Sequence, residues 1–207
     1  MSMGMMLLRH FMTLWATIDP IGSLALFVGL TASLSRTDRR RVAARATVYS
    51  AVILVVTVVI GQFVLDAIGI HLLSLKLAGG LILFVLSLKM LFGDMDTSAA
   101  LDDPGRDIAV FPLAVPSIAG PGAITAAIVL TDNDVYTVPE QALTSVMLLA
   151  VLAITYVLFL LSEKVLRLIG RSGAAILVRI MGIILAALSV ELVMGALGIG
   201  VWAKVKH

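Results

Sequence analysis

Pro116-Ser117-Ile118-Ala119-Gly120-Pro121-Gly122-Ala123-Ile124-Thr125 stands in the middle of an apolar run from Ile108 to Leu130. A run of this length is sufficient to cross a bilayer. Its centre does not continue a regular helix, because Pro121 lacks a backbone N–H and clashes with the preceding turn. Backbone groups freed in hydrocarbon must be satisfied by protein, water or a ligand. The stretch therefore predicts a broken helix that faces a protein-lined cavity, the kind of place where transporters bind their cargo.

The composition of the 207-residue chain is that of an integral membrane protein. Hydrophobic residues make up 60% of it and charged residues 14%, against about 25% charged residues in a soluble domain. The absence of cysteine excludes a disulfide scaffold, a thiolate metal site and a cysteine nucleophile. The three histidines, His10, His71 and His207, lie too far apart in sequence to predict a metal cluster. With no serine–histidine–acid set and no phosphate-binding loop, the sequence predicts neither an enzyme nor a cofactor or nucleic-acid partner.

Six apolar runs, each close to the roughly 20 residues that span a bilayer, follow one another with short polar connections. We therefore predict an all-α integral membrane protein with six transmembrane helices in a single membrane domain, residues 1–207. The runs cover Met6–Leu30, Thr47–Ile68, Leu73–Phe92, Ile108–Thr131, Ala142–Leu161 and Ala174–Ile199.

The two halves of the chain show internal similarity. A shift of 101 residues places Pro20 on Pro121, and a shift of 102 residues places Gly80 on Gly182. Because each half has three helices, the halves must cross the membrane in opposite directions, as in the inverted repeats of secondary transporters. We predict two inverted three-helix repeats in which helices 1 and 4 are broken. The first repeat covers 1–92, an acidic linker 93–107, and the second repeat 108–199.

Lysine and arginine are distributed unevenly among the connections, which predicts the orientation in the membrane. The connection Arg36–Arg45 is rich in arginine, and Glu163–Arg171 is predicted to form a basic interfacial turn. With both segments on the inner side, both termini are predicted outside, and the arginine cluster favours contact with anionic membrane lipid. The basic residues then left on the outer side are Arg9, Lys76, Lys204 and Lys206.

The first half has its own break at Asp19-Pro20, followed by Ile21-Gly22. Aspartate is a favoured N-cap and proline is favoured at the first helical position, so a second half-helix is predicted to begin here, near the bilayer midplane. Gly120 brings no side chain to the equivalent position in the second half. The N–H groups around Gly122 and Ala123 are therefore left to hold a ligand anion.

We interpret the two breaks as a site for a zwitterion, with the substrate carboxylate at the Gly120–Ala123 turn and the substrate ammonium near Asp19. Two alternatives remain open. In the first alternative, Asp19 serves only as a structural cap. In the second, the break at Gly120-Pro121-Gly122 is only a packing kink where helices approach closely. The predicted substrate-binding residues are Asp19, Pro20, Gly22, Ser23, Ser117, Gly120, Pro121, Gly122, Ala123 and Thr125.

Glu191 is the second acidic residue inside an apolar run, flanked by Val190 and Leu192. Acids at this depth mark proton relays or ion paths, so Asp19 and Glu191 are predicted to take part in ion coupling. The alternative for Glu191 is a neutral hydrogen-bonding acid, or one near the outer interface. Lys89 lies within a turn of the inner end of its helix, where snorkelling to the interface is the favoured interpretation.

Stretches spread over nearly the whole chain carry a family resemblance. They are Asp19-Pro20-Ile21-Gly22, Ala78-Gly79-Gly80, Phe111-Pro112-Leu113-Ala114-Val115-Pro116 leading into Ile118-Ala119-Gly120-Pro121-Gly122-Ala123-Ile124, and Arg179-Ile180-Met181-Gly182. At these residues the chain resembles the MarC-type family of six-helix bacterial inner-membrane proteins, whose members include neutral amino acid transporters. The resemblance implies a place in the bacterial inner membrane and transport of small neutral amino acids such as glycine or alanine, driven by an ion gradient. Glu191 departs from the many relatives that carry glutamine there.

The favoured interpretation is a secondary transporter of glycine- or alanine-like zwitterions, coupled to a proton or another cation, with alternating access at the midplane. The alternatives are an exporter of another small solute and a non-transporting membrane scaffold or stress-related protein. A transporter predicts a polar cavity between the two breaks, whereas a scaffold predicts a dry and filled centre. The substrate, the direction of transport, the coupling ion and the formation of a homo-oligomer are left open.

Overall fold

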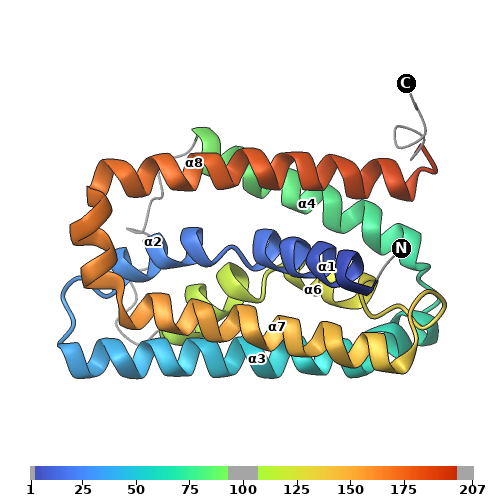
Figure 1. Cartoon of the computed structure of the whole chain (residues 1–207), viewed down its shortest axis with the longest axis horizontal. Coiled ribbons are helices and arrows are strands. Elements are labelled where there is room, and N and C mark those ends of the chain that lie inside the picture. Colours follow the sequence, from blue (N-terminus) through green and yellow to red (C-terminus); the bar gives the residue numbers. More distant parts are fainter. Residues whose placement is uncertain (1–2, 93–106, 200–207) are drawn as a thin grey trace.

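The computed structural model describes residues 3–92 and 107–199, without the side chains of residues 166–169, 171, 172 and 174. All regular elements of the described part are helical (Figure 1). The predicted linker 93–107 lies outside the described residues except for Asp107. The elements are α1 (Met3–Ile18), α2 (Pro20–Leu30), α3 (Arg36–Ala67), α4 (Leu72–Phe92), η1 (Ala109–Ile118), α6 (Pro121–Val129), α7 (Val138–Leu160) and α8 (Ser162–Ala196).

Within these residues, five helical segments are long and apolar enough to cross a bilayer, and a bent pair brings the number to six. The pair consists of η1 and α6, which meet at an angle of 51°. α1 and α2 together form the first span, Met3–Leu30, interrupted at Asp19. The predicted all-α membrane architecture is confirmed, because the apolar runs have the length that a bilayer requires.

At the arginine-rich end, one helix extends beyond its apolar run and one predicted turn is wrong. α3 begins at Arg36 instead of Thr47, because Ser35 caps it by accepting a hydrogen bond from Asp38 N at 3.2 Å. Hydropathy marks the part of a helix that lies in the bilayer and misses a polar first turn outside it. The segment expected to be a basic turn after Glu163 is helical, and the chain bends at Gly170, whose φ of 66° favours glycine.

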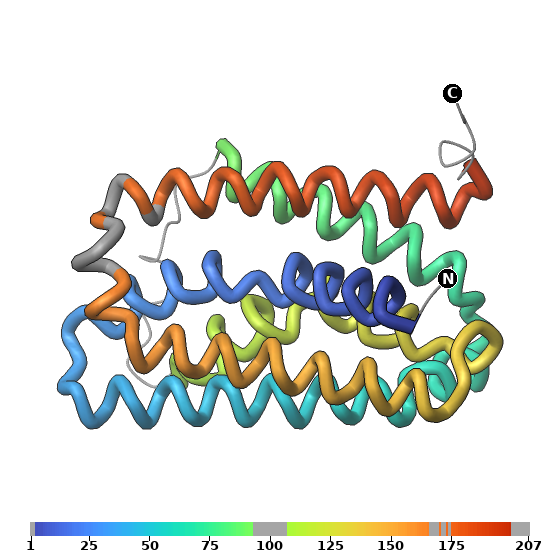
Figure 2. The backbone as a smooth tube through the Cα atoms, viewed as in Figure 1, coloured from blue at the N-terminus to red at the C-terminus, as the bar shows by residue number. Residues whose placement is uncertain are grey.

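The two broken spans occupy the middle of the molecule (Figure 1). α4 packs along α8 on one side, and α3 packs against α7 on the other. The start of α1 and the end of α8 lie at the same end of the molecule, whereas the α2–α3 connection and the start of α8 lie at the opposite end (Figure 2).

A core of buried apolar side chains joins the broken spans to α3 and α7. Phe27 of α2 stacks on Phe159 of α7 with ring centroids 4.4 Å apart and planes within 4°. The outer face of α3, in contrast, leaves large apolar side chains such as Val59 and Phe63 exposed. Exposed apolar faces of this kind are expected where a helix contacts lipid, since lipid chains take the place of buried neighbours.

Candidate functional site

The first break is a single residue. Asp19 adopts φ 47° and ψ 70°, a left-handed conformation that few residues other than glycine, asparagine and aspartate adopt. Its N–H still donates to Trp15 O at 3.0 Å, so α1 is complete up to this point. Its Oδ1 accepts a hydrogen bond from Gly22 N at 3.0 Å, which caps α2 as the sequence predicts. Asp19 as a whole residue is 9% exposed, and no described residue donates to its Oδ2.

The second break has no side-chain cap. Gly120 precedes α6 with extended φ and ψ, and Pro121 takes the first helical position. A Cβ on Gly120 would collide with the carbonyl oxygen of Pro116, so the chain folds back here in a way that only glycine permits. Within the described residues, neither Gly122 N nor Ala123 N donates to a partner. The first turn of α6 therefore keeps the unsatisfied donors that the sequence predicts.

A direct contact joins the two breaks. Ser23 of α2 and Ser117 of η1 are 2.9 Å apart between their Oγ atoms, a hydrogen bond in which either hydroxyl can donate. The residues are 94 positions apart in sequence. The polar side chains that flank the breaks therefore meet at the centre of the molecule.

A cavity of about 520 Å³ opens beside this contact. It lies within the range of roughly 300–1,000 Å³ in which small-molecule sites fall, and most of its wall is apolar. The polar side chains on the wall are few and include one carboxylate and one ammonium. The lining residues are Thr17, Asp19, Gly22, Ser23, Leu26, Leu81, Ile82, Val85, Leu86, Lys89, Met90, Pro112, Pro116, Ser117 and Pro121.

The predicted substrate-binding residues divide into two groups. Those that line the cavity are Asp19, Gly22, Ser23, Ser117 and Pro121. Those that are buried without lining it are Pro20, Gly120, Gly122, Ala123 and Thr125. α4 covers two residues of the second group: a Cβ on Gly122 would collide with Leu83, and a Cβ on Gly79 would collide with Thr125. Of the predicted site, the structure thus places Asp19 and its neighbours on the cavity lining. The first turn of α6 reaches the lining only at Pro121.

Lys89, which the sequence favours as a snorkelling residue at the interface, belongs to the site. It comes from the last turn of α4 and lines the same cavity as Asp19. Within the described chain it forms neither an ion pair nor a hydrogen bond. The spacing of Ile82, Val85 and Lys89 places them on one helix face, but only the packing of α4 reveals that this face lines the cavity.

Glu191, the other predicted ion-coupling residue, lies on an exposed face of α8 and is absent from the cavity lining. The shift of 102 residues makes it the counterpart of Lys89. Among the described residues, no group of three or more histidine, aspartate or glutamate side chains is arranged to hold a metal ion. The polar groups available to a ligand in the cavity are therefore those of Asp19, Lys89 and the neighbouring hydroxyls.

Comparison with known proteins gives concordant matches. A family model described as "MarC family integral membrane protein" matches residues 4–199. A membrane protein of Archaeoglobus fulgidus is 40% identical over 194 residues, which cover 90% of this chain and 90% of the relative. The inner membrane protein MarC of Salmonella arizonae is 32% identical over 191 residues, covering 84% and 86%. The protein of the same name from Escherichia coli is 32% identical over 199 residues, covering 86% and 88%. No solved structure matches the chain.

Proposed function

The chain belongs to the MarC family of integral membrane proteins, and we propose that it is a secondary transporter of small neutral amino acids coupled to a proton or another cation. The observation that carries the proposal is the cavity of about 520 Å³ that both helix breaks line, with Asp19 nine-tenths buried on its wall. Intramembrane acids that face a cavity mark substrate and ion pathways. A scaffold has no need for an open cavity at the point where two spans are interrupted.

An inverted repeat of the two halves is part of the proposal, and the packing of α4 on α8 supports it. A Cβ on Gly80 would lie 3.0 Å from Ser189 O, and a Cβ on Gly182 would lie 3.3 Å from Ser87 O. The shift of 102 residues relates Gly80 to Gly182 and Ser87 to Ser189, so the two contacts are equivalent when the halves are exchanged. Other packing follows the same exchange, since α3 packs on η1 and α6 while α7 packs on α1 and α2. Two such halves rocking against each other would give alternating access to the cavity.

In the pose that we favour, Asp19 receives the substrate ammonium and Lys89 receives the carboxylate. A helix N-terminus stabilises an anion by only ~0.3–1 kcal/mol, and by up to about 2 kcal/mol when partly buried. Millimolar affinity requires about 4 kcal/mol. A hydrogen bond to the buried Asp19 carboxylate contributes about 1.5–3 kcal/mol, and an exposed ion pair with Lys89 adds up to ~1 kcal/mol. The two opposite charges that line the cavity therefore account better for binding than the covered first turn of α6 does.

The proposed function is tested by uptake of labelled glycine and alanine into proteoliposomes, with and without an inward proton gradient. We expect uptake that depends on the gradient and that unlabelled substrate competes away. In the same assay Glu191→Gln decides whether the acid on α8 contributes to coupling. Absence of uptake by folded protein would contradict amino acid transport and favour another solute or a scaffold.

Replacing Lys89 with glutamine is expected to weaken glycine binding about fivefold, because the side chain is exposed and exposed ion pairs contribute up to ~1 kcal/mol. Lys89→Arg keeps the charge and should restore most of the affinity. Lys76→Gln, on the same helix but outside the cavity lining, is the matched control. Equal affinity in Lys89→Gln and wild type, measured by calorimetry, would remove the carboxylate role.

The proposal also places the protein in the bacterial inner membrane with both termini outside. The similar proteins of Salmonella arizonae and Escherichia coli carry the name inner membrane protein. Because the chain has no cysteine, single cysteines can report orientation directly. With an impermeant maleimide on intact spheroplasts, we expect Asn133→Cys, in the α6–α7 connection, to be labelled and Ser35→Cys, in the α2–α3 connection, to be protected. The reverse pattern would invert the orientation.

A further inference from the structure

A second pocket, of about 280 Å³, lies where the first turn of α3 meets the junction of α7 and α8. We propose that it binds the headgroup of an anionic phospholipid. Its charged lining consists of Arg36, Arg39, Arg40 and Lys164 with a single acid, Glu163, so four positive charges and one negative charge leave a net +3. This pocket shares no lining residue with the cavity of Asp19 and Lys89. The lipid proposal therefore does not depend on the transport function proposed for that cavity.

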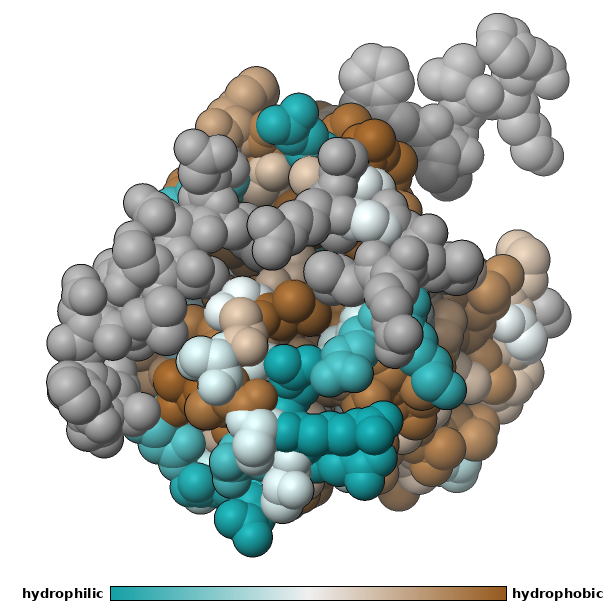
Figure 3. All heavy atoms as spheres, turned by 90° about the vertical axis from the view of Figure 1, so that its left-hand side faces the viewer, coloured by the Kyte–Doolittle hydropathy of each residue, from teal (hydrophilic) through white to brown (hydrophobic). Residues whose placement is uncertain are grey.

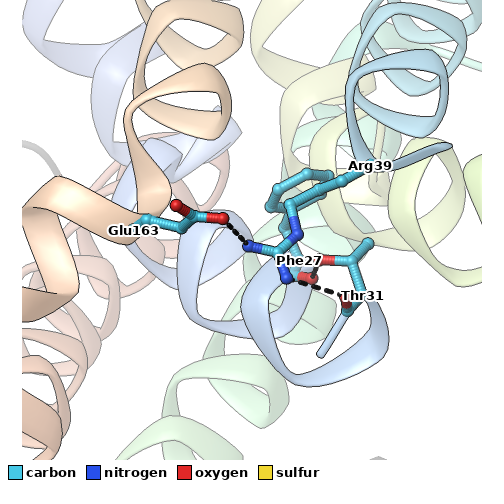
Figure 4. A network of polar contacts seen from close by, with 4 residues as sticks. All are labelled: Phe27, Thr31, Arg39 and Glu163. Carbon is cyan, nitrogen blue, oxygen red and sulfur yellow. Dashed lines mark hydrogen bonds and ion pairs between the residues drawn. The ribbon is translucent and has the colours of Figure 1, made fainter. Parts of the chain in front are cut away.

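Arg39 lines this basic pocket and is held by polar contacts to two other segments (Figure 4). Its guanidinium donates to Glu163 Oε1 at 2.9 Å and to Thr31 O at 3.1 Å, which ties the end of α2 to the start of α8. Its Nε is buried and has no partner among the described residues. The two hydrogen bonds hold the guanidinium of Arg39 in place, so that this positive charge lies fixed at the pocket.

The remaining cations of the basic pocket have no acidic partner among the described residues. Within the described part of the chain, Arg36, Arg40 and Lys164 form no ion pair. The other arginines of the cluster behave differently: Arg41 pairs with Asp38 at 3.6 Å, and Arg45 pairs with Asp107. The pocket thus gathers the uncompensated charge of the arginine-rich end, and clustered arginine and lysine at a membrane surface recognise anionic headgroups.

The surroundings favour a lipid over a soluble phosphate. Leu160 and Leu161, which line the same pocket, are each 40% exposed. Viewed from this end, hydrophilic side chains are bordered by hydrophobic ones (Figure 3). A phospholipid meets both requirements at once, because its phosphate faces the cations while its acyl chains lie along the apolar side chains.

The test is the affinity of the purified protein for phosphatidylglycerol, phosphatidylcholine and glycerol 3-phosphate, measured by native mass spectrometry and by the shift of the melting temperature. We expect phosphatidylglycerol to bind most tightly, and Arg36→Gln and Arg40→Gln each to weaken it about fivefold. Arg41→Gln removes the same charge from the same helix outside the pocket and should have no such effect.

Three results would overturn the proposal. Equal affinity for phosphatidylcholine would show that a net negative headgroup is not required. An equal loss of phosphatidylglycerol affinity in Arg41→Gln would show that the overall positive charge of α3, and not the pocket, determines binding. Glycerol 3-phosphate binding as tightly as the lipid would identify a soluble phosphate as the ligand. Arg36 and Arg40 are exposed, so their variants should fold, which melting curves without lipid will check.

Discussion

Alanine at position 120 is expected to destabilise the protein by about 1–3 kcal/mol, the cost of overpacking a filled site. Gly120 is buried at the junction of η1 and α6, and a Cβ there would collide with the carbonyl oxygen of Pro116. A backbone oxygen does not rotate away as a side chain does, so relief requires moving one of the two helical segments. Because Pro116 and Pro121 line the cavity, that movement should also lower any substrate binding.

The matched control for Gly120→Ala is Gly195→Ala in α8. Nothing lies within 4 Å of a Cβ at position 195, and alanine is favoured over glycine by about 1 kcal/mol inside a helix. Melting in detergent should therefore shift downwards for Gly120→Ala and should not fall for Gly195→Ala. If Gly120→Ala and Gly195→Ala have the same melting temperature, the close approach between Gly120 and Pro116 does not determine the structure of the second break.

Local features of this fold were predictable from the sequence. The spans follow from the length of apolar runs, and the interruptions follow from Pro20 and Pro121, since each proline begins a new helical segment at its first position and cannot donate to the preceding turn. The cap formed by Asp19 is equally local, because its acceptor reaches a donor three residues ahead. The same reasoning located the breaks that line the cavity.

Features that depend on packing between distant segments were not predictable. Leu83 covers Gly122, and Lys89 lines the cavity, because of how α4 lies against the broken spans. Both residues belong to an apolar helix whose faces look alike in sequence. The extra turns at the start of α3 were missed for another reason: hydropathy detects burial in lipid, and a capped polar turn carries none of that signal.

Asp19→Asn is expected to weaken binding of glycine and alanine at least tenfold while leaving the fold intact. Asparagine keeps an oxygen that accepts the hydrogen bond from Gly22 N, and it tolerates the left-handed conformation at this position. What it removes is the negative charge that faces the substrate ammonium in the proposed pose. A tenfold loss corresponds to about 1.4 kcal/mol, which lies at or below the ~1.5–3 kcal/mol of a charge-assisted hydrogen bond.

Two companion variants separate charge from architecture at Asp19. Asp19→Ala removes the cap as well, so its free energy of unfolding should fall by about 0.5–2 kcal/mol and its melting temperature should fall with it. Asp19→Asn should have the melting temperature of the wild type. Asp134→Asn is the control: it removes one carboxylate from the exposed α6–α7 connection. Glycine binding by this variant should equal that of the wild type. If a folded Asp19→Asn protein binds glycine as tightly as wild type does, Asp19 is a cap alone and the ammonium is held elsewhere. If it binds weakly yet still takes up glycine at saturating concentration without any response to the proton gradient, Asp19 carries both the substrate contact and the coupling.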